Sequence, residues 1–456
     1  MAMPQLEKIF KAYDIRGLVD TELNAEILQA VGASFVVALD IAATNGGPGA
    51  IVLGRDMRDS GIEYAQAFAT GVNSQGVDVI DIGLASTDQL YFASGKFKLP
   101  GAMLTASHNP AAYNGIKLCL AGAKPVGQET GLAKIKELVA AGSIKPADIT
   151  GSITNQDVLA DYAKFLHELA GLNQVRPLTV VVDAGNGMAG HTAPIVLALP
   201  GLTVIEMYFE LDGNFPNHEA NPIDPTNLVQ LQDKVIATKA DLGLAFDGDA
   251  DRCFLVDDTG ALVTPSALTA LIAKRFLVTN PGATIVHNLI SSKAVPEIIA
   301  EHGGHAVRTR VGHSFIKQVM AERNAVFGGE HSGHFYFRDF WFADSGMLAA
   351  LFAIAELSNG NQKFSELISS CARYPQSGEI NSQVPDVKAA IDRVKRTFGP
   401  GNELDELDGI TVTSQTWWLN VRASNTEPLV RLNVEADTAE ILQQQVAAAL
   451  AVIRDF

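Results

Sequence analysis

The ten residues LTVVVDAGNG (178–187) carry the clearest fold signal in the chain. Their first part, Leu178–Val182, is a continuous apolar run rich in β-branched residues, and it ends at a polar, glycine-containing turn. Helical patterning follows the turn. This order is typical of a buried parallel strand that leads into a helix in an α/β unit.

The same local plan occurs at two other places, each about one domain length away. Residues 50–54 (AIVLG) form an apolar run that ends at Arg55 and Asp56, ahead of a helical pattern over 62–72. Residues 284–288 (TIVHN) are followed by the polar turn 290–293 and a helical pattern over 295–301. The repetition predicts three related α/β domains in series.

The C-terminal part of the chain has a different pattern. Candidate strands at 409–414, 417–422 and 428–435 have hairpin spacing, and helical patterns flank them at 387–398 and 439–454. Strands at that spacing between helices indicate a small α+β domain. We therefore expect four domains, with the boundaries 1–152, 153–256, 257–369 and 370–456.

Composition limits the function classes. The chain of 456 residues has 34 Lys and Arg against 51 Asp and Glu, a formal net charge of −17, which argues against a general affinity for nucleic acid or anionic membranes. The three cysteines lie far apart and form no close pair, which indicates a reducing compartment. We recognise no signal peptide, and the longest apolar stretch (27–43) is interrupted and too short to span a bilayer. A cytoplasmic protein is expected.

The hexapeptide TASHNP (105–110) follows a candidate strand at 101–104. Asn-Pro favours a turn, so we expect Ser107 on a loop at the carboxyl end of a strand, where open α/β sheets present reacting groups. The residues alone leave open a nucleophile beside His108 or an ordinary hydrogen-bonded turn. Adjacent side chains tend to point apart, so His108 need not contact Ser107. The nucleophile elbow of hydrolases does not apply, because its flanking glycines are missing.

The hexapeptide DGDADR (247–252) is the strongest chemical signal, since it places three carboxylates on one short loop between two apolar runs. Such carboxylates repel one another unless a cation is present, and oxygen ligands suit Mg²⁺ or Ca²⁺. An EF-hand does not fit, because Arg252 replaces the required glycine and Asp258 the final glutamate. A solvated acidic turn stays open. The adjacent arginine suggests an anionic ligand that bridges the metal and Arg252.

Two further polar segments suit a sugar phosphate. GGEHSGH (328–334) is a glycine-rich loop with side chains suited to sugar hydroxyls, although an ordinary polar loop or a zinc site at its two histidines is the alternative. RASNTEP (422–428), followed by Arg431, has the groups of a phosphate cradle, but could equally be a hairpin turn. Arg16, Lys117 and Lys293 are further basic residues that stand out, although each by itself fits an ordinary surface charge.

Together these four segments, with YDIRG (13–17) near the start, resemble the α-D-phosphohexomutase family in their order and spacing. The resemblance covers essentially the whole chain. It implies three α/β domains and one α+β domain around a central cleft. Thr105 and Asn425 resemble the phosphomannomutase/phosphoglucomutase branch, whereas His331 stands where dual-specificity members often have methionine.

The resemblance also implies roles for individual residues. Ser107 would be the phosphorylated nucleophile, and Mg²⁺ would be held by Asp247, Asp249, Asp251 and the phosphoserine itself. Lys117 and His334 would exchange protons, Arg16 would steady the transferring phosphoryl group, and His108 would orient the serine loop. The implied substrate-binding residues are Tyr13, Arg252, Lys293, His313, Glu330, Ser332, Arg422, Ser424, Asn425, Thr426 and Arg431.

The implied activity is the reversible interconversion of hexose 1-phosphates and 6-phosphates of glucose, mannose or both. It would pass through the phosphoserine and a hexose 1,6-bisphosphate, which also serves as activator. To act as a base, Lys117 needs a lowered pKa, which we expect from neighbouring cations. We expect a monomer whose partners are small hexose phosphates. The alternatives are a phosphoglucosamine mutase and a non-catalytic Ca²⁺- or sugar-binding protein.

Overall fold

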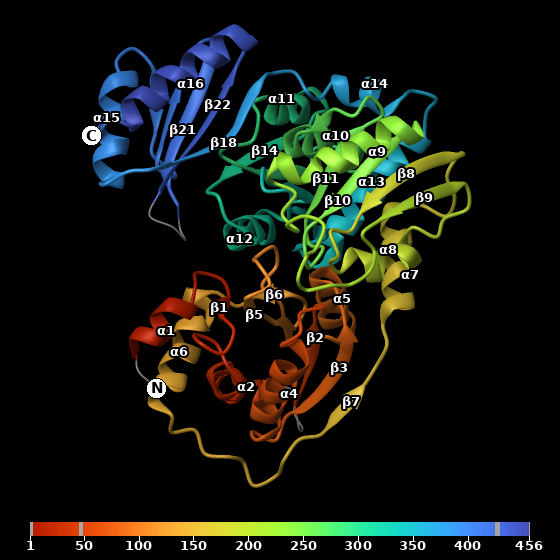
Figure 1. Ribbon diagram of the computed structural model, residues 1–456, viewed down its shortest axis with the longest axis vertical. Coiled ribbons are helices and arrows are strands. Elements are labelled where there is room, and N and C mark those ends of the chain that lie inside the picture. The colour runs from red at the N-terminus through yellow and green to blue at the C-terminus, as the bar shows by residue number, and fades with distance from the viewer. Residues whose placement is uncertain (1–2, 45–48, 425–428, 456) are drawn as a thin grey trace. The chain divides into compact units, whose positions relative to one another are not determined.

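The computed structural model describes residues 3–44, 49–424 and 429–455, and the chain forms two compact units (Figure 1). The first unit comprises residues 1–263 and 332–367, and the second comprises 264–331 and 368–456. Within the described residues, none of the helices has the length and apolar character needed to cross a membrane.

The first unit begins with a mixed sheet in the order β1-β5-β4-β2-β3-β7, with the short strand β6 beside β5. Its middle strand β2 runs parallel to β3 and β4, whereas β5 runs antiparallel to β4 and β1. The parallel strand expected at 50–54 is therefore confirmed, inside a sheet that also has an antiparallel half. The strands are β1 (Ile15–Leu18), β2 (Ala50–Arg55), β3 (Asp78–Leu84), β4 (Gly101–Leu104), β5 (Tyr113–Leu120), β6 (Lys124–Pro125) and β7 (Ile153–Asn155).

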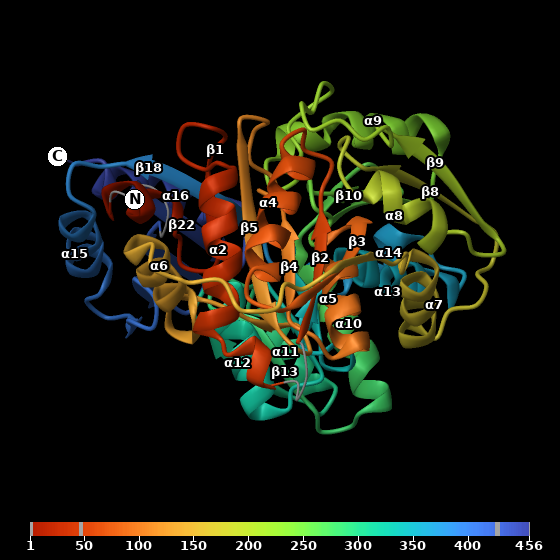
Figure 2. The same ribbon diagram turned by 90° about the horizontal axis from the view of Figure 1, so that it is seen from below.

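Two helices, α2 and α4, lie together across one face of this sheet (Figure 2). They approach closely because glycines stand where they cross. A Cβ on Gly32 would come within 2.2 Å of the Phe68 carbonyl oxygen, and one on Gly71 within 2.0 Å of the Gln29 oxygen. The helices of this region are α1 (Met3–Ile9), α2 (Ala25–Ala38), α3 (Ile41–Thr44), α4 (Gly61–Asn73), α5 (Thr87–Phe97) and α6 (Leu132–Ala141).

A second sheet of the first unit has the order β12-β11-β10-β8-β9. The strand β8 (Leu178–Asp183) is parallel to β9 (Leu202–Met207) and β10 (Leu242–Phe246), as its sequence predicts. From β10 the chain turns back into the antiparallel strand β11 (Cys253–Asp257), and β12 (Leu262–Val263) follows. The acidic hexapeptide 247–252 is therefore the loop of a buried hairpin.

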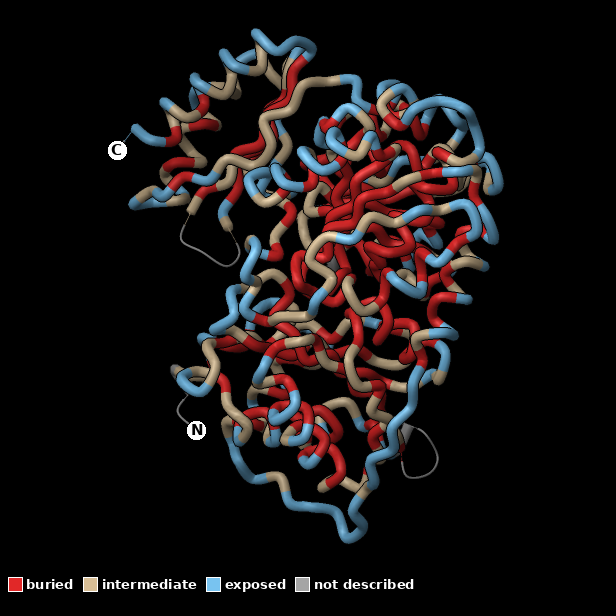
Figure 3. The backbone as a smooth tube through the Cα atoms, turned by 45° about the vertical axis from the view of Figure 1, so that its right-hand side comes forward, coloured by how far each residue is buried: buried red, intermediate tan, exposed pale blue. Residues whose placement is uncertain are grey.

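The helices around this second sheet are α7 (Leu159–Ala170), α8 (Ala189–Val196) and α9 (Val229–Thr238). The first unit also contains β16 (Phe335–Phe337), β17 (Ala343–Asp344) and the almost completely buried α13 (Gly346–Ser358). A further helix, α14 (Phe364–Ser369), follows. In Figure 3 the exposed connection over 141–157 forms a long pale blue stretch at the lower edge, in contrast to the buried strands.

The second unit contains three parallel strands, with β13 (Thr284–Asn288) between β14 (His305–Thr309) and β15 (Phe327–Gly329). The helices that accompany them are α10 (Pro265–Thr279), α11 (Ala294–Glu301) and α12 (His313–Arg323). The strand predicted at 284–288 and the helix predicted at 295–301 are both confirmed, the helix beginning one residue earlier.

The C-terminal part of the second unit is an antiparallel sheet in the order β18-β22-β21-β20-β19, packed against α15 (Val387–Phe398) and α16 (Ala439–Ile453) (Figure 1). The strands are β18 (Gln376–Gln383), β19 (Glu403–Asp405), β20 (Ile410–Thr413), β21 (Trp417–Ala423) and β22 (Leu429–Ala436). The predicted α+β character is confirmed. The four domain boundaries proposed from the sequence stay predictions.

Candidate active site

The loop that follows β4 presents Ser107, as the sequence predicts. Ser107 is buried and has a φ of 50°, in the left-handed region that residues with a side chain rarely adopt. Its Oγ donates a hydrogen bond to Asp247 Oδ2 at 2.8 Å, and its backbone N–H donates to Thr105 Oγ1 at 2.9 Å. The hydroxyl therefore points at the acidic loop of the second sheet.

His108 lies beside this hydroxyl, with its Nδ1 3.3 Å from Ser107 Oγ. Side chains of adjacent residues usually point apart, and here the left-handed backbone at Ser107 brings the two together. Burial lowers the pKa of His108 well below its usual value, and the positive charges of Arg252 and Arg16 lower it further. A neutral imidazole thus faces the serine.

The acidic loop gathers Asp247, Asp249 and Asp251, which are all buried, so that one oxygen from each lies within 4.8 Å of the others. Oδ1 of Asp249 has no hydrogen-bond partner among the described residues, which is costly for a buried carboxylate. Three converging oxygen ligands with an unsatisfied acceptor fit a hard divalent cation.

The carboxylates of this loop differ in their electrostatic surroundings. Burial raises the pKa of Asp247 to about 7, although Arg252, whose Nε donates to Asp247 Oδ2 at 2.8 Å, opposes the rise. Burial would also raise the pKa of Asp251, but Lys117 and His334 outweigh it and hold that pKa well below its usual value. Nη2 of Arg252 is buried and has no hydrogen-bond partner in the described structure. That donor is suited to an anion at the loop.

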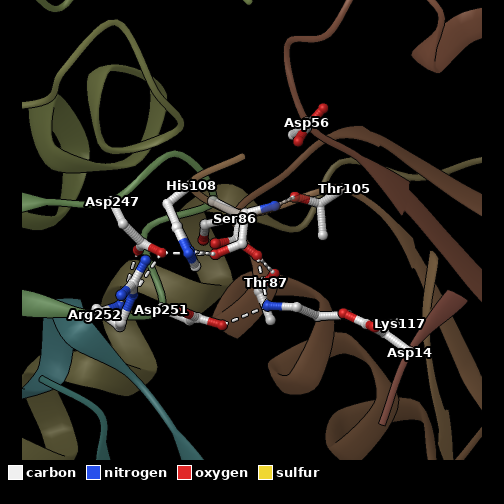
Figure 4. A network of polar contacts seen from close by, with 12 residues as sticks. Asp14, Asp56, Ser86, Thr87, Thr105, His108, Lys117, Asp247, Asp251 and Arg252 are labelled. Carbon is white, nitrogen blue, oxygen red and sulfur yellow. Dashed lines mark hydrogen bonds and ion pairs between the residues drawn. The ribbon is translucent and has the colours of Figure 1, made fainter. Parts of the chain in front are cut away.

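Lys117 extends from β5, next to β4, and its Nζ contacts Asp249 Oδ2 at 2.7 Å and Asp251 Oδ2 at 2.6 Å (Figure 4). Burial would lower the pKa of Lys117, but the two carboxylates outweigh it and raise the pKa well above its usual value. The expectation of a pKa lowered by neighbouring cations is therefore wrong. The closest charged neighbours are acidic, so the ammonium keeps its proton.

Arg16 and His334 complete this group within the first unit. Arg16 lies on β1 and donates from Nη1 to Asn109 Oδ1 of the serine loop, while its Nη2 pairs with Asp14 at 2.5 Å. Tyr13 lies two residues before β1 and is half-buried.

The backbone of His334 forms an isolated antiparallel β-bridge with that of Arg252. The His334 side chain places Nε2 3.5 Å from Asp251 Oδ1, and its Nδ1 lies 2.8 Å from Ser332 Oγ.

The second unit contains the remaining predicted residues. Lys293 Nζ pairs with Asp437 Oδ1 at 2.6 Å and lies 3.9 Å from the centroid of the Tyr374 ring. Buried Glu330 accepts a hydrogen bond from the backbone N–H of Gly312 at 3.1 Å, directly before α12. His313 is the first residue of α12, and its side chain lies outside the described part of the structure.

Two predicted arginines of the second unit, Arg422 on β21 and Arg431 on β22, stand opposite each other and meet at one carboxylate. Arg422 Nη2 pairs with Glu379 of β18, and Arg431 Nη1 lies 3.1 Å from Glu379 Oε1. Arg431 Nη2 also donates to Ser424 Oγ at 3.1 Å. The predicted residues Asn425 and Thr426 lie outside the described residues.

Four family models together match most of the chain. They describe the three α/β/α domains and the C-terminal domain of phosphoglucomutase/phosphomannomutase and match residues 7–144, 160–260, 264–374 and 379–452. The chain belongs to the phosphoglucomutase/phosphomannomutase family. This confirms the family recognised from the sequence, the fold class and the prediction that the chain is an enzyme of the phosphohexomutase class.

Individual members of this family match along nearly their whole length. A phosphomannomutase of Escherichia coli is 40% identical over 443 residues, covering 94% of this chain and 96% of its own. The phosphomannomutase/phosphoglucomutase of Pseudomonas aeruginosa is 37% identical over 442 residues, covering 96% and 93%. A solved family structure from Burkholderia thailandensis has a TM-score of 0.87 at 32% identity and covers 98% of each chain.

A more distant solved structure shares only the fold. It is the N-acetylphosphoglucosamine mutase of Aspergillus fumigatus in complex with GlcNAc-6P and magnesium, with a TM-score of 0.61 at 15% identity. The match covers 100% of this chain and 97% of the Aspergillus fumigatus chain.

Three polar residues that the structure places in or near the candidate sites were not singled out from the sequence. Buried Arg58 holds the serine loop, and Glu379 joins the two arginines described above. Buried Asp88, near the start of α5, accepts hydrogen bonds from Tyr162 at 2.7 Å and Ser345 at 2.6 Å, and also one from Ser86. Each acts through contacts with residues far away in the sequence, so no local pattern marks it.

Proposed function

We propose that this enzyme interconverts the 1-phosphates and 6-phosphates of glucose and mannose by way of a phosphorylated Ser107. The observation that carries the proposal is the convergence of Ser107 Oγ, three buried carboxylates and an ammonium group on one spot of the first unit. Phosphoryl transfer depends on positioning and charge neutralisation, which such a constellation supplies.

In the proposed half-reaction, a hydroxyl oxygen of the hexose monophosphate attacks the phosphorus of phospho-Ser107. The bond between phosphorus and Ser107 Oγ breaks as the bond to the sugar oxygen forms. The products are the hexose 1,6-bisphosphate and the free serine. After the bisphosphate has turned end for end, the other phosphoryl group returns to Ser107 by the reverse of this step.

We assign Mg²⁺ to Asp247, Asp249 and Asp251, where it would offset negative charge on the phosphoryl oxygens. The unsatisfied Oδ1 of Asp249 and the oxygen-only donor set support this assignment. The magnesium complex of the Aspergillus fumigatus enzyme agrees with the choice of metal. Arg252 Nη2 and Arg16 Nε, both buried without a hydrogen-bond partner in the described structure, are the donors proposed for the phosphoryl oxygens.

The proton of the sugar hydroxyl needs an acceptor, and the departing Ser107 oxygen needs a donor. We assign the acceptor to His334 and the donor to Lys117, whose raised pKa keeps it protonated. His108 is assigned to orient the Ser107 hydroxyl that it contacts. Each role reverses in the return step, as microscopic reversibility requires.

The phosphate that does not react needs its own binding groups, which must accept either end of the bisphosphate. We assign this role chiefly to Arg422, Ser424 and Arg431, because two arginines beside a hydroxyl suit a phosphate dianion. Tyr13, Lys293, His313, Asn425 and Thr426 remain proposed substrate ligands, and Glu330 and Ser332 are assigned to the sugar hydroxyls.

The test is phosphorus NMR of the purified enzyme with Mg²⁺ and a trace of glucose 1,6-bisphosphate. Glucose 1-phosphate, mannose 1-phosphate and glucosamine 1-phosphate are supplied in parallel, and the phosphorylation state of Ser107 is read by peptide mass. Conversion of the glucose and mannose esters to their 6-phosphates is the expected result. Conversion of the glucosamine ester alone would keep the reaction but overturn the substrate. Turnover without label on Ser107 would overturn the covalent mechanism.

A further inference from the structure

Arg58 lies in the chain segment that follows β2, within the sequence GRDMRDSG (54–61). Its side chain is only 2% exposed, which is unusual for a guanidinium group. A charge in such a place requires partners for its hydrogen-bond donors. The positions of those partners indicate what the arginine does.

The donors of Arg58 are used almost entirely on one loop. The guanidinium has five N–H groups, and the structure gives it five hydrogen bonds. Nε donates to the carboxylate of Asp56 at 3.2 Å. The two Nη atoms donate to four backbone carbonyl oxygens: those of Ser107 (2.9 Å), Asn109 (2.6 Å), Pro110 (3.0 Å) and Tyr113 (2.8 Å).

This saturation excludes Arg58 as a ligand for the substrate phosphate. No N–H group is left over, and the ring of Phe215 lies over the guanidinium carbon at 5.4 Å. The backbone of Gly213 also comes close, since a Cβ there would lie 3.0 Å from the Cα of Arg58. Arg58 is therefore covered by Phe215 and Gly213, and its hydrogen bonds reach the reacting groups only through the serine loop.

The carbonyl of Ser107 is held from a second direction by the acidic loop. A Cβ on Gly248 would lie 2.5 Å from the Ser107 carbonyl oxygen, so the two loops touch backbone to backbone. With its oxygen confined between Gly248 and Arg58 Nη2, the peptide group of Ser107 has little freedom to rotate. This matters because the left-handed conformation of Ser107 is strained and relaxes unless its surroundings hold it.

We propose that Arg58 is a positioning residue for phosphoryl transfer, holding Ser107 in the left-handed conformation that directs its Oγ to Asp247. The inference rests on the proposed function of Ser107. Arg58 also donates a hydrogen bond to the backbone carbonyl of Asn109, whose side-chain oxygen accepts one from Arg16. One guanidinium group therefore orients both Ser107 and the residue of the loop that contacts Arg16. The role concerns the rate of transfer, since Arg58 itself touches no substrate.

The decisive experiment compares Arg58→Lys and Arg58→Ala with the wild-type enzyme. Lysine keeps the charge but reaches fewer carbonyls. We expect kcat to fall by about 100-fold in both variants, the scale expected for a misplaced reacting group, while KM for glucose 1-phosphate stays within about twofold. Guanidinium chloride at millimolar concentration should partly restore kcat of Arg58→Ala without changing KM, because the ion can re-enter the vacated site.

Arg176→Lys is the matched control. Arg176 also donates to backbone carbonyls of the first unit, those of Leu357, Gly360 and Gln362, but none of these residues belongs to the serine or acidic loop. This control should change the melting temperature and leave kcat within about twofold. Equal losses of kcat in the Arg58 and Arg176 variants would show a general effect on folding and overturn the proposal.

Two other outcomes also decide the matter. Folded Arg58→Lys with kcat within about threefold of wild type would overturn the positioning role. Failure of that variant to fold would overturn it too, since the guanidinium would then serve the fold as a whole. The wild-type enzyme is assayed first for label on Ser107, so that an absence of the covalent mechanism is recognised before any Arg58 variant is interpreted.

Discussion

Ser107 Oγ donates a hydrogen bond of 2.8 Å to Asp247 Oδ2, across 140 positions of the sequence. The contact joins the loop after β4, in the first sheet, to the hairpin loop between β10 and β11, in the second sheet. The proposed nucleophile and one of the carboxylates proposed to bind Mg²⁺ thus orient each other. The predictions below follow from this arrangement and from its supports.

Replacing the proposed nucleophile is the simplest test of the covalent mechanism. We expect Ser107→Ala to lose at least about 10⁴-fold in kcat, because the proposed mechanism offers no other hydroxyl to take the phosphoryl group. The melting temperature should stay within about 4 °C, since one hydrogen bond is lost. Turnover is followed by phosphorus NMR and unfolding by calorimetry. Retention of most activity would contradict the phosphoserine.

Removing the ammonium group should strengthen metal binding. Lys117 Nζ occupies oxygens of Asp249 and Asp251 that a cation would also use, so Lys117→Met should bind Mg²⁺ about tenfold more tightly while losing turnover. Titration calorimetry measures the affinity. Lys96→Met, which removes an exposed ion pair with Asp161, is the control. Equal or weaker Mg²⁺ binding by Lys117→Met would contradict the expected competition.

The contact between the two loops leaves no room for a side chain at Gly248. A Cβ there would lie 2.5 Å from the Ser107 carbonyl oxygen, so Gly248→Ala should displace the serine and lower kcat by about 100-fold. In Gly360→Ala the nearest atom to the new Cβ is 3.9 Å away, and kcat should not change. Steady-state kinetics of both variants make the comparison. Normal turnover by Gly248→Ala would show that the loops can separate without consequence.

Buried Asp88 should make stability depend on pH. Burial raises its pKa to about 6 from the ordinary aspartate value of 3.8. Its contribution to the free energy of unfolding is therefore fully present below pH 3.8 and is lost as pH rises through 6. The folded state binds the proton more tightly than the unfolded state in this window. Between pH 5 and pH 7 the loss amounts to about 1 kcal/mol.

The variant Asp88→Asn isolates this effect because asparagine does not titrate. The melting temperature of the wild type relative to Asp88→Asn should fall by about 1 to 2 °C between pH 5 and pH 7. Calorimetry at several pH values gives this difference directly. A difference that stays constant, or grows with pH, would mean that Asp88 is ionised throughout.

Loss of Arg422 should affect both monophosphates alike. We expect Arg422→Ala to raise KM for glucose 1-phosphate and glucose 6-phosphate together, by about 10- to 100-fold, because a charge-assisted contact to phosphate is lost. Arg393→Ala is the control in the same unit, since Arg393 donates to the carbonyls of Val452 and Ile453, far from the proposed phosphate ligands in the sequence. Kinetics in both directions give the two KM values. A rise for only one monophosphate would rule out a shared phosphate site.

Periodicity in the sequence predicts the framework of this fold well. The apolar runs at 50–54, 178–182 and 284–288 are β2, β8 and β13, each within one residue at its end. A continuous apolar run marks a strand that is buried on both faces, and this signal lies within a few neighbouring residues. The antiparallel partners of these strands, such as β5 and β11, are less visible, because pairing depends on residues distant in the sequence.

The site was predictable where several reactive groups stand together in one motif, as in TASHNP and DGDADR. The electrostatic surroundings of the site residues could not be predicted in the same way. The sequence places Lys117 near no obvious carboxylate, and only the packing of the two sheets of the first unit brings it to Asp249 and Asp251. The same holds for Arg58, which looks like a surface charge after a strand until its four carbonyl partners are known.

The hydrogen bond from Ser345 to Asp88 has a consequence for synthesis of the protein. The two residues are separated by 257 positions, which a ribosome needs on the order of 10 to 50 s to translate. During that time the first sheet can form while one donor to its buried carboxylate does not yet exist. We expect the nascent chain to stay susceptible to proteases near α5 until residue 345 has left the exit tunnel.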